Sequence, residues 1–194
     1  MEGPRLYIAT FEVPPHPLTR RKALAVQRQQ VQHLLEKITP RPRLQHHKGG
    51  KPYLANEPEM SVSVSHTAGF ALVGVAPIGS QIGVDIEVHS QKAEQLAHRF
   101  CSPYELHLLK QYGYTPVVLW SAKESVYKVV SAYVSGFGKQ IVLQAINPPV
   151  LTFLVIHDNG QQQQVCAQVL HCEQPTVTYA LTPMLLPPKV LEWE

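Results

Sequence analysis

The sequence predicts an α+β protein made of two comparable halves, and three observations support this fold class. Short alternations of apolar and polar residues predict strands, and apolar residues spaced three and four apart predict helices. Each half contains helical patterns and ends in patterns typical of antiparallel strands. We place the halves at residues 1–88 and 89–194, and we expect a ligand to bind in the cleft between them.

The composition predicts a globular protein with a small positive charge. Of the 194 residues, 44% are hydrophobic and 16% are charged, so a packed core is expected and extensive disorder is not. The formal net charge of +3 is too small to indicate nucleic-acid binding. It suits a small anionic ligand or an acidic protein partner better.

The sequence also bears on location and redox state. The N-terminal stretch MEGPRLYIATFEVPP lacks the features of a signal peptide, and no apolar run approaches the roughly 20 residues of a membrane helix. The cysteines Cys101, Cys166 and Cys172 are odd in number and lack a CxxC spacing, which argues against a disulfide framework or a zinc site. We expect a cytoplasmic protein, outside the membrane, with reduced and mostly buried thiols.

The first half begins with a strand over residues 5–13 and a helix that Thr19 caps and that continues to about residue 38. Arg28 lies on the apolar stripe of this helix. It is therefore either an arginine that reaches solvent from the stripe edge or one that faces an internal anion site. The cations at 20–22 oppose the helix dipole and form either a solvated cluster or part of such a site.

A loop and a hairpin follow. Residues 39–52 are expected to form a loop whose end, Gly-Gly-Lys51-Pro, permits close approach of a ligand. Strands are expected over 60–65 and 70–76. Ser65 and His66 then lie at a hairpin end, where they either point into a site or simply decorate the surface.

The strand predicted over 82–88 carries two carboxylates. Side chains alternate along a strand, so Gly83, Asp85 and Glu87 share one face. Like charges at this spacing repel each other unless water or a bound cation lies between them. The face is either solvated or a cation site, and in the second case Gly83 would leave room for a ligand.

The second half begins with helical patterns over 91–100 and from Ser102. Ser102 and Glu105 form a capping box, which gives Glu105 a structural role before any catalytic one. A longer helix starts at Thr115-Pro116, and its predicted buried stripe comprises Val118, Ala122, Val126, Val129 and Tyr133.

The opposite face of this longer helix carries Trp120, Glu124 and Lys128. The Glu124–Lys128 spacing alone is typical of a surface ion pair worth a few tenths of a kcal/mol. Strands follow over 141–146, 151–156, 164–170 and 176–181, with a hairpin turn at 158–160. The proline-rich tail, 183–194, is expected to pack on the surface or to remain loose.

Taken together and in this order, these motifs resemble the 4′-phosphopantetheinyl transferases. The matching residues are Gly50-Lys51-Pro52, Ser65-His66, Gly83-Val84-Asp85-Ile86-Glu87, Arg99-Phe100-Cys101-Ser102 with Glu105, and Trp120-Ser121-Ala122-Lys123-Glu124-Ser125 with Lys128. The resemblance covers about residues 20–140, and its specific part is the pair GVDIE and W-x-x-KES-x-x-K. The KES form and the chain length are similar to the monomeric, broad-specificity, surfactin-synthetase-activating branch.

The resemblance implies a fold, a site and a reaction. The family fold is a pseudodimer of two similar α+β halves with antiparallel sheets and coenzyme A bound in the cleft between them. The family's Mg²⁺ ligands fall on Asp85, Glu87 and Glu124, and its coenzyme A contacts fall on Arg28, Lys51, Ser65, His66 and Lys128. The implied reaction transfers 4′-phosphopantetheine from coenzyme A to a serine of an apo acyl or peptidyl carrier protein, in fatty acid, polyketide or nonribosomal peptide biosynthesis.

Attack on a pyrophosphate needs charge neutralisation and positioning, and this assigns roles to the remaining residues. Glu124 is the first candidate for the base that accepts the serine proton, and Glu105 is the second. Lys128 would stabilise or protonate the leaving phosphate. The candidates for the carrier-docking face are Lys110, Val117 and Lys139.

Two other functions share parts of the pattern. Another magnesium-dependent phosphoryl-transfer enzyme or phosphohydrolase would use the same carboxylates, with water as the nucleophile. A non-catalytic carrier-protein-binding module would need no metal. The intact triplet of Asp85, Glu87 and Glu124 favours an enzyme.

Overall fold

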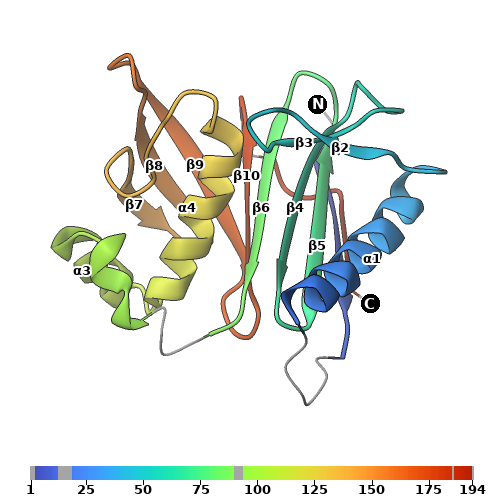
Figure 1. Cartoon of the computed structure of the whole chain (residues 1–194). Coiled ribbons are helices and arrows are strands. Elements are labelled where there is room, and N and C mark those ends of the chain that lie inside the picture. The colour runs from blue at the N-terminus through green and yellow to red at the C-terminus, as the bar shows by residue number, and fades with distance from the viewer. Residues whose placement is uncertain (1–2, 13–18, 90–93, 185, 194) are drawn as a thin grey trace.

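A computed structural model describes residues 3–12, 19–89, 94–184 and 186–193 (Figure 1). The fold combines helices with largely antiparallel sheets, which confirms the predicted α+β class. The helices are α1 (Arg20–Ile38), the 3₁₀ turn η1 (Ala97–Arg99), α3 (Pro103–Gln111) and α4 (Pro116–Val130). The strands are β1 (Arg5–Thr10), β2 (Leu44–His46), β3 (Pro52–Leu54), β4 (Ser61–Thr67), β5 (Phe70–Ala76), β6 (Gln81–Glu87), β7 (Ile141–Asn147), β8 (Val150–Ile156), β9 (Gln162–His171), β10 (Thr176–Thr182) and β11 (Val190–Trp193).

The strands form two main sheets, each covered by a helix. The first sheet has the order β11-β1-β5-β4 and the second has the order β6-β10-β9-β8-β7. Helix α1 packs on the first sheet and α4 on the second, and in Figure 1 both helices lie in front of their sheets. A separate hairpin, β2-β3, begins inside the segment 39–52 for which the sequence predicted a loop, so that expectation was wrong at β2.

Local signals explain where the helices begin and which faces they bury. Thr19 caps α1 by accepting a hydrogen bond from the backbone N–H of Lys22, as predicted. Ser102 and Glu105 form the predicted capping box at the start of α3. The predicted stripe of α4 is buried except at Tyr133, which lies beyond the helix end, is 56% exposed and stacks on His157.

The helix expected over 91–100 lies partly outside the described residues; of the described part, residues 94–95 are α-helical and residues 97–99 form η1. Within the described ranges, no helix is both long enough and apolar enough to cross a membrane.

The two sheets meet where β4 runs beside β6. The backbone N–H of Ile82 donates to Ser61 Oγ at 3.3 Å, and that of Val84 donates to Ser63 Oγ at 3.1 Å. Serine hydroxyls of β4 therefore take the place of the carbonyl groups that would continue a sheet. Strand β6 precedes the boundary we place at residue 88, although it pairs with β10 of the second sheet.

One apolar core is shared by both sheets. It contains Leu6 and Ile8 of β1, Leu72 of β5, alternate residues of β6 and three residues of β10. Because side chains alternate along a strand, the apolar residues of β6 enter this core while Gly83, Asp85 and Glu87 face α4. The shared core thus fixes which side of β6 presents its carboxylates.

The segment after β10 returns to the first sheet. Strand β11 pairs with β1 in parallel, with Arg5 opposite Val190. The backbone N–H of Lys189 donates to Pro4 O at 2.7 Å, and Tyr179 Oη donates to Leu186 O at 2.6 Å. The tail is therefore a bound edge strand, which its prolines had not suggested.

Candidate active site

Close contact between α4 and β6 builds the centre of the site. A Cβ atom at Gly83 would lie 1.9 Å from Ser125 O and 3.1 Å from Lys128 Cβ. The glycine therefore admits the backbone of α4, and the expectation that it leaves room for a ligand was wrong. Buried hydroxyls hold the helix in place, since Thr178 Oγ1 of β10 lies 2.9 Å from Ser121 Oγ and 2.7 Å from Ser125 Oγ.

This approach turns the polar face of α4 towards the carboxylates of β6. Trp120 Nε1 donates to Glu87 Oε1 at 3.1 Å. Two turns later, Lys128 Nζ donates to Val84 O at 2.7 Å and pairs with Asp85 Oδ1 at 2.9 Å. The face that resembled a solvated stripe in the sequence is therefore part of an interface.

The electrostatics bring Glu124 into the same cluster. Burial, then the charge of Asp85 and to a smaller extent that of Glu124, raise the pKa of Glu87 to about 7, against the hydrogen bond from Trp120 and the charge of Lys128. Burial and then Asp85 raise the pKa of Glu124, against Lys128. Three carboxylates therefore interact in a partly buried place that holds one lysine, and the cluster is short of positive charge.

We tested whether these residues fit Mg²⁺, the ion that the resemblance implies. Asp85 Oδ2 is buried and has no hydrogen-bond partner, so an oxygen is available where a hard cation would bind. In the described parts of the chain, no three His, Cys, Asp or Glu side chains form a ready-made metal cage. The residues fit the ion in charge and donor type. Asp85, Glu87 and Glu124 are the carboxylates that would hold it, with their side chains brought closer together around the ion.

A cavity of about 370 Å³ opens beside this cluster and is lined by both halves. The first half contributes the 46–52 segment and β4, including Lys51 and His66, and the second contributes Tyr127, Lys128 and Ser131. Lys51 Nζ donates to Gln81 Oε1, and partial burial lowers the pKa of Lys51. Two lysines and two histidines line the cavity, which favours an anionic ligand.

Two predicted coenzyme A contacts lie elsewhere than expected. Ser65 is buried and donates to Asp85 Oδ1 at 2.8 Å, and it is not among the residues that line the cavity. Arg28 is exposed on α1 and is also not in the cavity lining. Its role as a phosphate contact remains a prediction.

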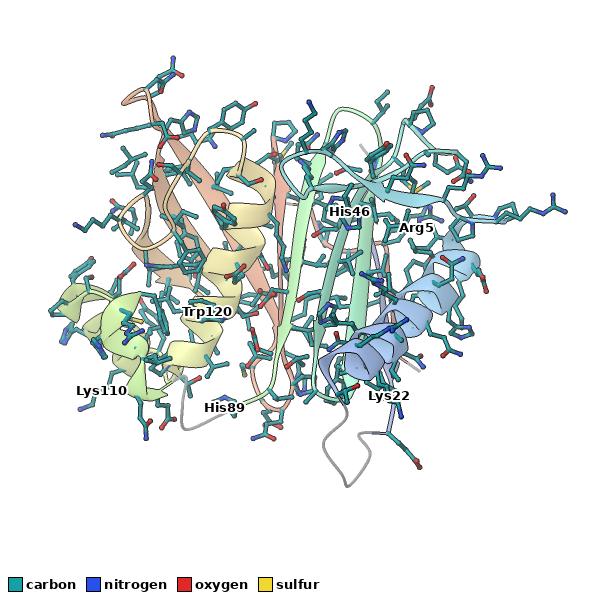
Figure 2. The ribbon with its side chains drawn as sticks, viewed as in Figure 1. Arg5, Lys22, His46, His89, Lys110 and Trp120 are labelled. Carbon is teal, nitrogen blue, oxygen red and sulfur yellow. The ribbon has the colours of Figure 1, made fainter. Side chains whose placement is uncertain are left out.

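The cations at the start of α1 also lie away from the cavity. Arg21 and Lys22 are exposed, and the side chain of Arg20 lies outside the described residues. Figure 2 shows Lys22 and the cavity residue His46 at opposite ends of the first half. The solvated cluster is the better explanation of Arg21 and Lys22.

Glu105 forms part of a buried network. Its Oε1 pairs with Lys123 Nζ at 2.8 Å and accepts from the backbone N–H of Leu143 at 2.9 Å, while its Oε2 accepts from that of Ser102 at 2.7 Å. Lys123 also donates to Phe100 O at 2.8 Å. The hydrogen-bonding capacity of Glu105 is largely used within the fold, so its candidacy as a base remains a prediction that these contacts do not favour.

The buried role of Lys123 was not predicted from the sequence, although the sequence contains a signal for it. Lys123 lies on the same helical stripe as Leu119, Val126 and Val130, at a position where an apolar residue is due. The structure buries it completely.

The candidate docking residues divide into two groups. Lys110 and Lys139 are exposed, and in Figure 2 Lys110 extends outward from α3. Val117 is only 1% exposed, so its assignment to a docking face was wrong. It packs inside the fold at the start of α4.

The comparison with protein families agrees with this geometry. Residues 81–182 match the family model of the 4′-phosphopantetheinyl transferase superfamily. The match runs from the start of β6 to the end of β10, covers more than half of the chain and includes the three carboxylates and Lys128. No curated protein matches the chain. The chain therefore belongs to the 4′-phosphopantetheinyl transferase superfamily.

Proposed function

We propose that the protein is a magnesium-dependent holo-carrier-protein synthase. It transfers 4′-phosphopantetheine from coenzyme A to a serine of an apo acyl or peptidyl carrier protein. The observation that carries this proposal is the place of Lys128, which both lines the cavity and pairs with Asp85 of the carboxylate cluster. We further propose that the protein acts as a cytoplasmic monomer of the broad-specificity, surfactin-synthetase-activating branch.

The cavity suits the phosphates of coenzyme A. Lys51, His66 and Lys128 line it and supply cationic or hydrogen-bonding groups, and we assign the coenzyme's phosphates to them. In the proposed reaction the serine oxygen of the carrier protein forms a bond to the phosphorus next to pantetheine. The bond from that phosphorus to the bridging oxygen breaks, and 3′,5′-adenosine bisphosphate leaves.

The chain's own residues manage charge and protons in this reaction. We assign the acceptance of the serine proton to Glu124, because its carboxylate belongs to the same charged cluster as Asp85 and Lys128, and Lys128 lines the cavity. Lys128 neutralises or protonates the leaving phosphate. Asp85, Glu87 and Glu124 would hold Mg²⁺, which when bound neutralises phosphate charge and polarises the phosphoryl group.

The test is incubation of the full chain with coenzyme A, Mg²⁺ and a panel of apo acyl and peptidyl carrier proteins. Intact-mass measurement should show one phosphopantetheine group added to a carrier, and chromatography should show an equal amount of adenosine bisphosphate. EDTA should abolish both, and Glu124→Gln should remove most of the rate.

The alternatives predict other results. A phosphohydrolase would release adenosine bisphosphate while no carrier gains mass. A binding module would retain carrier protein without any dependence on Mg²⁺. Either result would refute the proposed transfer.

A further inference from the structure

Three serines on one face of β4 point towards β6. Ser61 and Ser63 accept hydrogen bonds from backbone N–H groups of β6. Ser65, next in the row, instead donates its hydroxyl hydrogen to the side chain of Asp85, at 2.8 Å from Oδ1. Ser65 therefore contacts a carboxylate, whereas Ser61 and Ser63 contact only the backbone of β6.

The two oxygens of Asp85 have different surroundings. Oδ1 receives Ser65 Oγ and Lys128 Nζ, whereas Oδ2 is buried without a partner. Two donors on one oxygen, coming from β4 and from α4, fix the plane of the carboxylate. The other oxygen is thereby left free at a defined position.

Ser65 is poorly placed for a phosphate. Its residue is 9% exposed, and it is absent from the cavity lining that includes its neighbour His66. A serine hydroxyl has one hydrogen to donate, and that hydrogen is used on Asp85. Donating to a phosphate would require giving up this bond.

We propose that Ser65 is a positioning residue for Asp85, holding Oδ1 so that Oδ2 is presented to a divalent cation, and that its hydroxyl does not donate to a coenzyme A phosphate. This inference rests on the proposed function, because it takes Asp85 as a metal ligand. Partners that orient a metal ligand typically contribute 10–100-fold to metal affinity.

The test uses Mn²⁺ as a paramagnetic probe on the full chain without coenzyme A, with free Mn²⁺ followed by electron paramagnetic resonance. Ser65→Ala should weaken Mn²⁺ binding by roughly 10–100-fold. Ser65→Thr, which keeps the hydroxyl, should recover most of the affinity. Coenzyme A affinity measured in EDTA should stay within about twofold of wild type in both variants, because the cavity wall is unchanged.

The matched control is Ser61→Ala, which removes a hydroxyl from the same row but one that contacts only the backbone of β6. It should leave Mn²⁺ affinity within about twofold, a change of no more than about 0.4 kcal/mol. Circular dichroism of each variant reports whether the fold is retained.

Several outcomes overturn the inference. It fails if Ser65→Ala binds Mn²⁺ normally but loses coenzyme A affinity in EDTA. It also fails if Ser65→Ala and the control Ser61→Ala lose Mn²⁺ affinity equally. It also fails if wild-type protein binds no Mn²⁺, even where transfer to carrier protein is observed. If Ser65→Ala weakens Mn²⁺ binding but wild type modifies no carrier, the inference stands and the proposed function fails.

Discussion

The buried ion pair between Lys123 and Glu105 permits a stability prediction. Lys123 is fully buried, and its ammonium lies 2.8 Å from Glu105 Oε1 and 2.8 Å from Phe100 O. Lys123→Met keeps an unbranched side chain in this space and removes the charge. Glu105 would then remain in the interior without its cation.

Removing one partner of a buried ion pair typically costs about 3–5 kcal/mol of unfolding free energy. Glu105 would keep its bonds from the backbone N–H groups of Ser102 and Leu143, so we expect the lower end, about 3 kcal/mol. For a chain of this length, that corresponds to a melting temperature lower by roughly 6–12 °C.

Urea unfolding followed by circular dichroism measures the change. The control is Lys110→Met, on the exposed side of α3, which should change the unfolding free energy by less than about 0.5 kcal/mol. The double variant Lys123→Met/Glu105→Gln should lose less than the sum of the two single losses, because the residues are in contact. If Lys123→Met lies within about 1 kcal/mol of wild type, the buried pair does not need its charge balance and the reasoning fails.

Three further predictions concern single positions. Gly83→Ala should destabilise the protein by about 3 kcal/mol or more because its Cβ would meet helix backbone at 1.9 Å, whereas Gly49→Ala, with open space around it, should change urea stability little. In EDTA, the unfolding free energy should fall as pH rises from about 4.5 to 7, because Glu87 keeps its proton in the folded state to a pKa of about 7 and loses it earlier when unfolded. Glu87→Gln should reduce that slope in urea titrations, and an unchanged slope would contradict the assignment. In mass-resolved alkylation the exposed Cys172 should react first, and Cys101, whose pKa burial raises to about 12, should react only on unfolding; early labelling of Cys101 would refute this.

Local patterns carried most of the fold prediction. The capping box of Ser102 and Glu105 lies within four residues of chain, and the alternation along β4 and β6 is visible in the sequence alone. Such signals involve residues that are close together in the sequence, so they can be recognised without the structure. The order of the motifs then grouped Asp85, Glu87, Glu124 and Lys128, whose charges interact in the structure.

Contacts between distant segments could not be predicted in the same way. A glycine beside two carboxylates permits either a ligand or a close helix, and only the position of α4 decides that Gly83 serves the helix. Ser65 looked like a turn residue facing a site, but its partner Asp85 lies across a joint between two sheets. Lys123 interrupted an apolar stripe, and its partner Glu105 comes from another helix.

The parallel pairing of β11 with β1 also affects the order in which the protein can fold during synthesis. Strand β1 leaves the ribosome before β11, because strands β2 to β10 and all the helices lie between them in the chain. Until then the outer edge of β1 has no partner, and an open strand edge is a template for association with other chains. Truncated translation products that lack β11 are therefore expected to be more prone to aggregation than the loss of four residues alone would suggest.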